Sequence, residues 1–225
     1  MSAMPRPPSG VLFDLDGTLL DSAPDLYDAL CELCDEESRP HPDYAPVRAV
    51  VSRGARAVLR AGLADVDEGG IESRLARFLE LYAQFMGRDS HPFAGVPDLL
   101  DALEAARVPW GIVTNKAGFL TEPLLERLAL AARTSAVVCG DTLPQRKPDP
   151  APVLLACERA GMDPARAVFV GDDRRDVEAG RAAGLCTVAV TWGYLDGGDP
   201  HTWGADAVVD DASALASLLG LGAAA

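Results

Sequence analysis

The sequence predicts an α/β protein, with a Rossmann-like parallel sheet core flanked by helices and an α-helical cap inserted after the first strand. Two observations lead to this fold class. Short apolar, β-branched segments alternate with helical patterns, which is typical of strands buried on both faces of a parallel sheet. The connection between the first two segments, residues 22–92, is far longer than an ordinary crossover and shows only amphipathic helical patterns.

The expected elements of the core follow in chain order. Six apolar segments are expected to be strands: Val11–Leu15, Trp110–Thr114, Ala136–Cys139, Ala167–Val170, Cys186–Val190 and Ala207–Val209. Four helical patterns lie between them, at about residues 96–107, 118–131, 150–161 and 174–184. Asp149-Pro150 and Asp163-Pro164 are typical of helix starts, and Gly184 is typical of a helix end.

The long connection is expected to fold as a separate cap. Its three helical patterns lie near residues 25–36, 46–63 and 71–87. Pro40-His41-Pro42 and Gly69-Gly70 are expected to form the turns between them. The predicted division is therefore a core made of residues 1–21 and 93–225 and a helical cap made of residues 22–92.

Composition narrows the possible functions. The net charge is −14, from 34 acidic and 20 basic residues, with no basic run. Such a chain is a poor partner for nucleic acid or an anionic membrane, and an anionic substrate would need local positive charge. No apolar segment approaches a membrane span, and residues 1–8 lack the apolar stretch of a signal peptide, so we expect a cytoplasmic protein.

The cysteines point to the same compartment. There are five, an odd number scattered along the chain, which argues against a disulfide framework and for a reducing environment. Cys31 and Cys34 form a CxxC pair inside a helical pattern, without a second pair of metal ligands. We interpret this pair as core packing.

Polar residues gather where the expected strands end. The first strand leads into Asp14-Leu15-Asp16-Gly17-Thr18, and the second leads into Thr114-Asn115-Lys116. Lys147 follows the third strand, and the fourth leads into Gly171-Asp172-Asp173, with Asp176 one turn later. Because the carboxyl ends of parallel strands meet at one edge of a sheet, these side chains should converge. Several carboxylates at close range need a cation between them, and oxygen ligands suit Mg²⁺.

The distribution of lysine supports a site at this edge. The chain has eighteen arginines but only two lysines, Lys116 and Lys147, and both follow core strands. An ammonium group can contact a phosphate oxygen and a carboxylate together. We therefore interpret Lys147 as functional, while for Lys116 a functional and a chance placement both stay open.

These motifs resemble the four signatures of the haloacid dehalogenase superfamily. Asp14-x-Asp16-Gly17-Thr18 is similar to the first signature and Thr114-Asn115 to the second. Lys147-Pro148-Asp149 is similar to the third and Gly171-Asp172-Asp173-x-x-Asp176 to the fourth, in the family's order. The position of the insert matches the helical cap of the subgroup that includes phosphoglycolate phosphatase. The resemblance implies a magnesium-dependent phosphatase acting on a small phosphorylated substrate.

The resemblance also implies roles for the residues that contact the reacting phosphate. Asp14 would be the nucleophile that forms an aspartyl-phosphate. Asp16 would be the general acid for the leaving oxygen and then the general base for the hydrolytic water. The Thr114 hydroxyl, the Asn115 backbone amide and Lys147 would hold the phosphoryl oxygens.

A magnesium site is implied at the same edge. Its ligands would be Asp14, the Asp16 carbonyl and Asp172. Asp173 and Asp176 would orient metal-bound waters or the neighbouring lysine from outside the ligand set.

Substrate selection is expected to lie in the cap. Gly54 would let the backbone approach the ligand, while Arg53 and Arg56 would pair with a carboxylate. An ordinary helix start with solvent-facing arginines explains the same residues equally well. Lys116 is a further candidate for substrate binding.

A finer resemblance concerns the substrate. Three stretches resemble the N-acetylmuramic acid 6-phosphate phosphatases of peptidoglycan recycling: Val51-Ser52-x-Gly54-Ala55-Arg56-Ala57, Trp110–Lys116 and Gly193-Tyr194 through Trp203–Asp206. That substrate and phosphoglycolate both carry a phosphate and a carboxylate. Trp192, Tyr194 and Trp203 would either line the entrance to the site or pack in the core or within loops.

Two other functions stay open. A sugar phosphomutase uses the same core and would show isomerisation exceeding phosphate release. A non-catalytic binding module would have no chemical need for Asp14, Asp16, Lys147 and Asp172 together. Dehalogenases do not need a second acid two residues after the nucleophile, so Asp16 favours phosphoryl transfer. The protein is expected to be a monomer or a homodimer.

Overall fold

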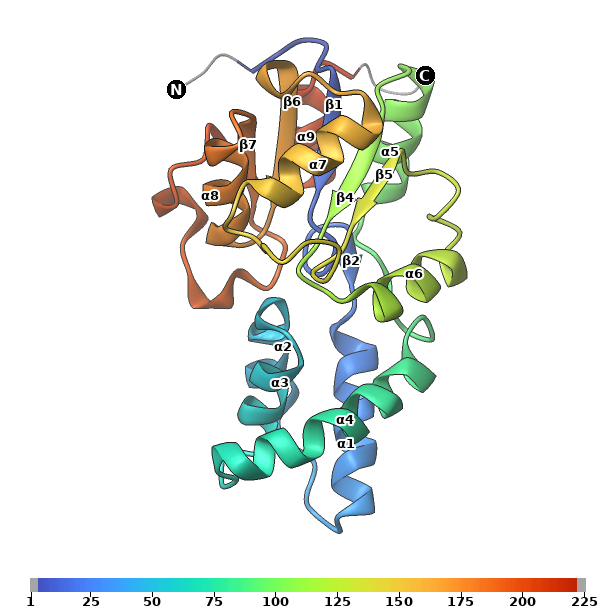
Figure 1. Ribbon diagram of the computed structural model, residues 1–225, viewed down its shortest axis with the longest axis vertical. Helices are drawn as coiled ribbons and strands as arrows, with labels where there is room; N and C mark the ends of the chain where they lie inside the picture. The colour runs from blue at the N-terminus through green and yellow to red at the C-terminus, as the bar shows by residue number, and fades with distance from the viewer. Residues whose placement is uncertain (1–3, 222–225) are drawn as a thin grey trace.

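The computed structural model describes residues 4–221, so the chain ends at 1–3 and 222–225, which the expected core includes, lie outside the described residues. A six-stranded parallel sheet forms the centre of the upper part of the molecule in Figure 1. Its strands are β1 (Gly10–Phe13), β4 (Trp110–Val113), β5 (Ala136–Val138), β6 (Ala167–Gly171), β7 (Cys186–Val190) and β8 (Ala207–Val209).

The strand order in this sheet is β5-β4-β1-β6-β7-β8, with the first strand in the middle. This is the doubly wound Rossmann order, so the expected fold class is confirmed. Ligands of such sheets bind beyond the carboxyl ends of the strands at the point where the strand order reverses. In this chain that point lies at β1.

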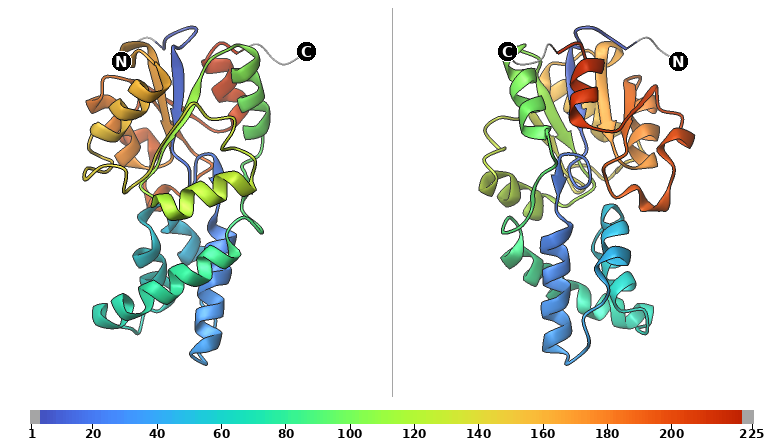
Figure 2. Two further views of the ribbon diagram at one scale, coloured as in Figure 1. Left: turned by 45° about the vertical axis from the view of Figure 1, so that its right-hand side comes forward. Right: turned by 180° about the vertical axis from the view of Figure 1, so that it is seen from behind.

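Helices cover both faces of the sheet. Seen from behind, α5 and α9 cover the face opposite to α7 and α8 (Figure 2). The helices of the upper part are α5 (Val96–Ala105), α6 (Gly118–Arg127), α7 (Ala151–Ala160), α8 (Arg174–Ala182) and α9 (Ala212–Leu218). Val11 and Phe13 of β1 pack in one apolar cluster and Leu12 packs in another, because successive side chains of a strand point to opposite faces.

The lower part of the molecule in Figure 1 is helical. Its helices are α1 (Ala23–Glu36), α2 (Tyr44–Ala49), α3 (Ala55–Gly62) and α4 (Glu68–Phe85). In α1 the side chains of Leu26, Ala29, Leu30 and Leu33 are buried. Their spacing of three and four residues forms one apolar stripe, and α1 packs along α4.

The chain passes between the two parts through a short ribbon. β2 (Leu20–Asp21) and β3 (His91–Pro92) pair in antiparallel orientation, so the outgoing and returning segments lie side by side. The Asp25 carboxylate in α1 accepts hydrogen bonds from the backbone amides of Asp89 (2.8 Å) and Ser90 (3.2 Å). These contacts fasten the returning segment to the start of the first helix.

Several expectations about the inserted segment are wrong in detail. No strand was expected between residues 22 and 92, yet β3 lies at the end of this segment. The sequence did not indicate it, because two residues are too few to show a strand pattern. The helix expected over 46–63 is broken into α2, a 3-10 turn at Val51–Arg53, and α3. Gly54 causes the break, since its φ of 85° is left-handed and cannot continue a helix.

The expected turn at Gly69-Gly70 is also wrong, because both residues belong to the first turn of α4. The side chain of Asp67 accepts a hydrogen bond from the Gly70 amide (2.8 Å) and thereby starts the helix before the two glycines.

Gly184 ends α8 as expected, with a φ of 84°. Helix α9 was not expected. Among the described residues, none of the helices is long and apolar enough to cross a membrane.

Candidate active site

The parallel register of the sheet brings the polar residues together at one edge. Phe13 of β1 lies opposite Ile112 of β4 on one side and Val170 of β6 on the other. β1 ends at this level, and β4 and β6 each end one residue later, at Val113 and Gly171. Asp14 and Thr114 follow directly, and Asp172 follows Gly171, the last residue of β6.

Asp14, Lys147 and Asp176 form a buried ionic group at this edge. The Lys147 ammonium lies 2.7 Å from Asp14 Oδ1 and 2.7 Å from Asp176 Oδ1. Burial raises the pKa of both carboxyl groups, although the ammonium opposes this effect. Burial would lower the pKa of Lys147, but the two carboxylates more than offset it and the pKa is raised. Lys147 therefore stays charged beside Asp14.

Asp172 completes a cluster of carboxylates. Carboxylate oxygens of Asp14, Asp172 and Asp176 all lie within 4.8 Å of one another, and all three residues are buried. Burial, followed by repulsion from Asp14, raises the pKa of Asp172 to about 7. Lys147 contacts Asp14 and Asp176 but no contact joins it to Asp172, so within this group one positive charge stands against three carboxylates when all are ionised. The donor set and this charge match a divalent cation with oxygen ligands.

The position of Asp172 is fixed from three sides. The Thr18 hydroxyl donates to Asp172 Oδ1 (3.0 Å), and the Tyr194 backbone amide donates to Oδ2 (2.9 Å). The Ser52 hydroxyl donates to the same oxygen from the inserted segment (3.3 Å). Gly17 is required beside it, because its φ is 91° and a Cβ would lie 2.2 Å from Asp172 Oδ2.

Asp16 lies apart from this cluster and is held by its own partners. It accepts hydrogen bonds from the Ser22 hydroxyl and from the Lys116 ammonium, whose nitrogen lies 3.2 Å from Oδ1. Lys116 also donates to the Tyr82 hydroxyl (2.6 Å), which belongs to α4. Lys116 thus joins the Asp16 carboxylate to the inserted helices, and its expected contact with substrate stays a prediction.

Thr114 and Asn115 shape the loop beside Asp14. The buried Thr114 hydroxyl accepts a hydrogen bond from the Lys116 backbone amide (3.1 Å). The Asn115 side chain donates to the Lys147 carbonyl (3.0 Å) and accepts from the Lys147 amide (3.1 Å). The side chain of Asn115 therefore holds the loop that carries Lys147.

Asp173 acts locally as the cap of α8. Its carboxylate accepts from the Arg175 backbone amide (2.8 Å), and Asp176 accepts from the Asp173 amide (3.1 Å), which forms a capping box. Burial would raise the pKa of Asp173, but the Arg175 guanidinium outweighs it and lowers the pKa. Arg175 also donates to the Ser52 carbonyl (2.8 Å), so it ties α8 to the inserted segment.

A cavity of about 560 Å³ opens beside these groups, between the sheet edge and the inserted helices. Asp14, Asp16, Thr114 and Lys147 border it on one side. The cap residues expected to select substrate border it on the other side: Arg53, Gly54 and Arg56.

The contacts that these cap residues make within the protein are clear, while their expected contacts with substrate stay predictions. Arg56 makes two contacts with Glu72, so its charge is already matched within the insert. A Cβ on Gly54 would meet no atom within 4 Å, so its left-handed φ, not close packing, requires glycine.

The sequence did not indicate the contacts that four residues make in this region: Ser52, Tyr82, Arg175 and Tyr194. The Tyr194 hydroxyl is buried and accepts from the amides of Ser22 (2.8 Å) and Ala23 (3.0 Å), at the start of α1. No local pattern marks these residues, because their contacts depend on how the insert packs on the sheet.

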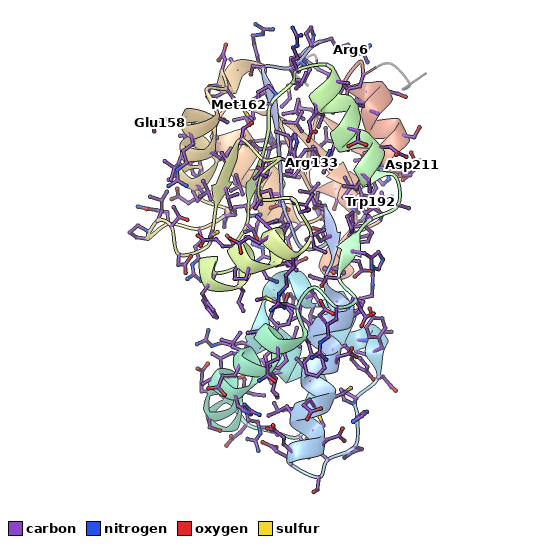
Figure 3. All side chains as sticks on the ribbon, turned by 90° about the vertical axis from the view of Figure 1, so that its right-hand side faces the viewer. Arg6, Arg133, Glu158, Met162, Trp192 and Asp211 are labelled. Atoms are coloured by element: carbon purple, nitrogen blue, oxygen red, sulfur yellow. The ribbon has the colours of Figure 1, made fainter. Side chains whose placement is uncertain are left out.

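Trp192 and Trp203 lie in different surroundings. Trp192 lies on the sheet-containing part rather than among the inserted helices (Figure 3), and its ring nitrogen donates to the Thr18 carbonyl (3.1 Å). Trp203 borders a second cavity of about 620 Å³, together with Arg53, Arg174 and Arg175. Packing of loops therefore accounts for Trp192, as one of the two expected alternatives.

Comparison with known proteins identifies the family to which the chain belongs. Residues 11–190 match the model of the haloacid dehalogenase-like hydrolases. An N-acetylmuramic acid 6-phosphate phosphatase of Pseudomonas aeruginosa is 44% identical over 93% of this chain and 93% of its own length. A phosphoglycolate phosphatase of Xanthomonas campestris is also 44% identical, over 91% of this chain and 93% of its own length.

A solved structure agrees with this family. It is described as a predicted phosphoglycolate phosphatase from Haemophilus somnus, and it superposes with a TM-score of 0.83 at 26% identity. The superposition covers 97% of this chain and 99% of the other. With its four signatures at one sheet edge and these relatives, all named as phosphatases, the chain belongs to the haloacid dehalogenase-like hydrolases.

Proposed function

We propose that this chain is a magnesium-dependent phosphomonoesterase that acts through an aspartyl-phosphate on Asp14. One observation carries the proposal. Asp14 lies at the cavity wall, in contact with a charged lysine and within a carboxylate cluster suited to a divalent cation. An anionic carboxylate can attack a phosphate ester only where positive charge offsets their repulsion, and this site supplies such charge.

The reaction proceeds in two displacements. Asp14 Oδ attacks phosphorus and forms an O–P bond while the ester P–O bond breaks, and Asp16 gives its proton to the leaving oxygen. Asp16 then takes a proton from water, whose oxygen attacks phosphorus and breaks the bond to Asp14. Inorganic phosphate leaves and both carboxyl groups return to their starting state. Lys116 and Ser22 hold Asp16 in place for both proton transfers.

The phosphoryl oxygens are held by three groups on the loops around Asp14. These are the Thr114 hydroxyl, the Asn115 backbone amide and the Lys147 ammonium, and all three residues border the cavity. Asp176 orients Lys147 through its 2.7 Å contact. Asp173 supports the same loop from the start of α8.

Magnesium would be held by Asp14, the Asp16 carbonyl and Asp172, and when bound it supplies positive charge to the transferring phosphoryl group. Asp176, which was expected outside the ligand set, lies close enough to share the cation or to orient its waters. The absence of nitrogen and sulfur donors in this cluster favours magnesium over zinc.

We also propose the division into a catalytic core of residues 1–21 and 93–225 and a cap of residues 22–92. The paired strands β2 and β3 lie at the two junctions, which supports boundaries at this point. Within the cap, Arg53, Gly54 and Arg56 border the cavity opposite Asp14 and contribute to substrate selection. The net charge of −14 fits a small cytoplasmic substrate better than nucleic acid or membrane.

The proposed substrate is a small phosphate ester that carries a carboxylate, with phosphoglycolate and N-acetylmuramic acid 6-phosphate as the two candidates. The names of the relatives include both, at equal identity. The test is phosphate release from each compound, measured as kcat/KM with magnesium and with chelator. We expect turnover that chelator abolishes. Isomerised sugar phosphate in excess of released phosphate would contradict the proposal and indicate a mutase.

A further inference from the structure

A hydrogen bond from the cap reaches the carboxylate cluster. The three carboxylates of this cluster, Asp14, Asp172 and Asp176, all belong to the core, where they follow β1 and β6. Ser52 belongs to the cap, in the 3-10 turn Val51–Arg53 between α2 and α3, and its hydroxyl donates to Asp172 Oδ2 (3.3 Å). A residue of the cap therefore contacts one of the proposed metal ligands.

The turn that carries Ser52 is fixed to the core by further contacts. The Arg175 guanidinium donates to the Ser52 carbonyl (2.8 Å) and is itself held by the Asp173 carboxylate through two hydrogen bonds of 2.8 Å. The turn also lies against a second 3-10 turn, Leu195–Gly197, which belongs to the core. The position of the Ser52 hydroxyl therefore depends on how the cap docks on this part of the core.

The three donors to Asp172 differ in origin. The Thr18 hydroxyl and the Tyr194 backbone amide come from the core, whereas the Ser52 hydroxyl comes from the cap. A movement of the cap away from the edge of the sheet would therefore remove Ser52 from Asp172 and leave the two core donors.

These donors determine which oxygen of Asp172 can bind a cation. An ionised carboxylate accepts at about four lone pairs, two on each oxygen. Tyr194 and Ser52 occupy both lone pairs of Oδ2, and Thr18 occupies one lone pair of Oδ1. One lone pair of Oδ1 is left for a cation. Without Ser52, Oδ2 would have a free lone pair as well, and either oxygen could bind the cation or water.

Hydrogen bonds of this kind affect metal affinity, because they orient the ligand. Loss of such a partner typically reduces metal affinity by roughly 10–100-fold. The Ser52 hydrogen bond, at 3.3 Å, is long for a hydroxyl donor. We therefore expect its effect at the lower end of this range.

We infer that Ser52 is a positioning residue that couples the docking of the cap to the affinity of the carboxylate cluster for magnesium, an inference that rests on the proposed magnesium-dependent function. Ser52 acts through Asp172 Oδ2. Coupling between two equilibria is reciprocal, so the docked position of the cap is favoured by bound magnesium by the same factor by which docking strengthens magnesium binding. The cap would thereby be held over the cavity that receives the phosphate ester.

The first test measures the Kd for Mg²⁺ by isothermal titration calorimetry in the natural chain, Ser52→Ala, Ser52→Thr and Ser73→Ala. Ser73 is the matched control, because it is a cap serine outside the cavity lining whose hydroxyl donates to the Gly70 carbonyl (2.8 Å). We expect Ser52→Ala to raise the Kd by about tenfold. Ser52→Thr keeps the hydroxyl, so it and Ser73→Ala should stay within about threefold of the natural chain.

The second test measures the reciprocal effect by hydrogen exchange. Saturating Mg²⁺ should slow the exchange of backbone amides across residues 50–56 of the natural chain, because it favours the docked turn. In Ser52→Ala, Mg²⁺ should leave this exchange nearly unchanged, whereas Ser73→Ala should behave as the natural chain does.

Two results would overturn the inference. One is a Kd of Ser52→Ala within about twofold of the natural value, or a Ser52→Thr variant that binds Mg²⁺ no better than Ser52→Ala. The other is amide exchange that Mg²⁺ slows equally in the natural chain and in Ser52→Ala, or in neither. A natural chain that binds no Mg²⁺ would instead contradict the proposed magnesium-dependent function itself.

Discussion

At the scale of single residues, the site is defined by carboxylates that are buried together. Asp14, Asp172 and Asp176 are held within 4.8 Å by backbone and hydroxyl donors and by one lysine. Groups of like charge stay this close only when protons or cations reduce their repulsion. Protons and a divalent cation would therefore compete for the same oxygens.

This competition predicts a pH-dependent stabilisation by magnesium. The pKa of Asp172 is raised to about 7, above its value near 4 in an unfolded chain. Without a cation, the stability that this group contributes is therefore present at low pH and decreases as pH rises from about 4 to 7. A bound cation favours the ionised form, so saturating Mg²⁺ should raise Tm more at about pH 8 than at about pH 6.

Thermal unfolding at both pH values, with and without Mg²⁺, measures this effect. Asp172→Asn is the matched variant, because it keeps the shape of the side chain but cannot ionise. We expect Asp172→Asn to lose most of the magnesium-dependent shift at both pH values. An equal shift at both pH values in the natural chain would argue against metal binding by Asp172.

At the scale of elements, α4 is joined to the edge of the sheet through one lysine. The Lys116 ammonium contacts Asp16 of the core and the Tyr82 hydroxyl of α4, and all three residues border the cavity. Burial raises the pKa of Tyr82 to about 12, so this hydroxyl stays neutral. The position of the proposed acid is thereby coupled to the position of the inserted helices.

Tyr82→Phe removes this link without altering the shape of the ring. We expect kcat/KM to fall by roughly 10–150-fold, since a hydrogen bond to a charged group contributes about 1.5–3 kcal/mol. Tyr27→Phe is the control, because the Tyr27 hydroxyl donates to the Pro42 carbonyl (2.8 Å) within the inserted segment. A larger loss in Tyr27→Phe than in Tyr82→Phe would show that the effect is general loosening of the helices.

The elements also show what local sequence can predict. The buried strands were predictable from short, continuous apolar and β-branched segments, and the long helices from apolar residues that recur at the helical period. The break at Gly54 was not, since a single glycine inside an amphipathic pattern is compatible with a continuous helix. The two-residue strands β2 and β3 exist only because they pair with each other, so the local sequence of neither one predicts a strand.

At the scale of the whole molecule, the site is built from both parts of the chain. The groups proposed for chemistry follow strands of one sheet, and the strand order dictates that they meet. Motif and topology together therefore predicted their convergence. The contacts of Ser52, Tyr82 and Arg175 required the packing of the insert on that sheet, which no local pattern encodes.

The central claim for the molecule is that Asp14 is the nucleophile of a magnesium-dependent phosphatase. The most direct measurement is kcat for phosphate release by Asp14→Asn beside the natural chain, at saturating Mg²⁺ and substrate, with circular dichroism as the check on folding. We predict a folded variant whose kcat is lower by at least about 10³-fold, because the amide is a poor nucleophile. A folded variant that retains kcat within about tenfold of the natural chain would contradict the account.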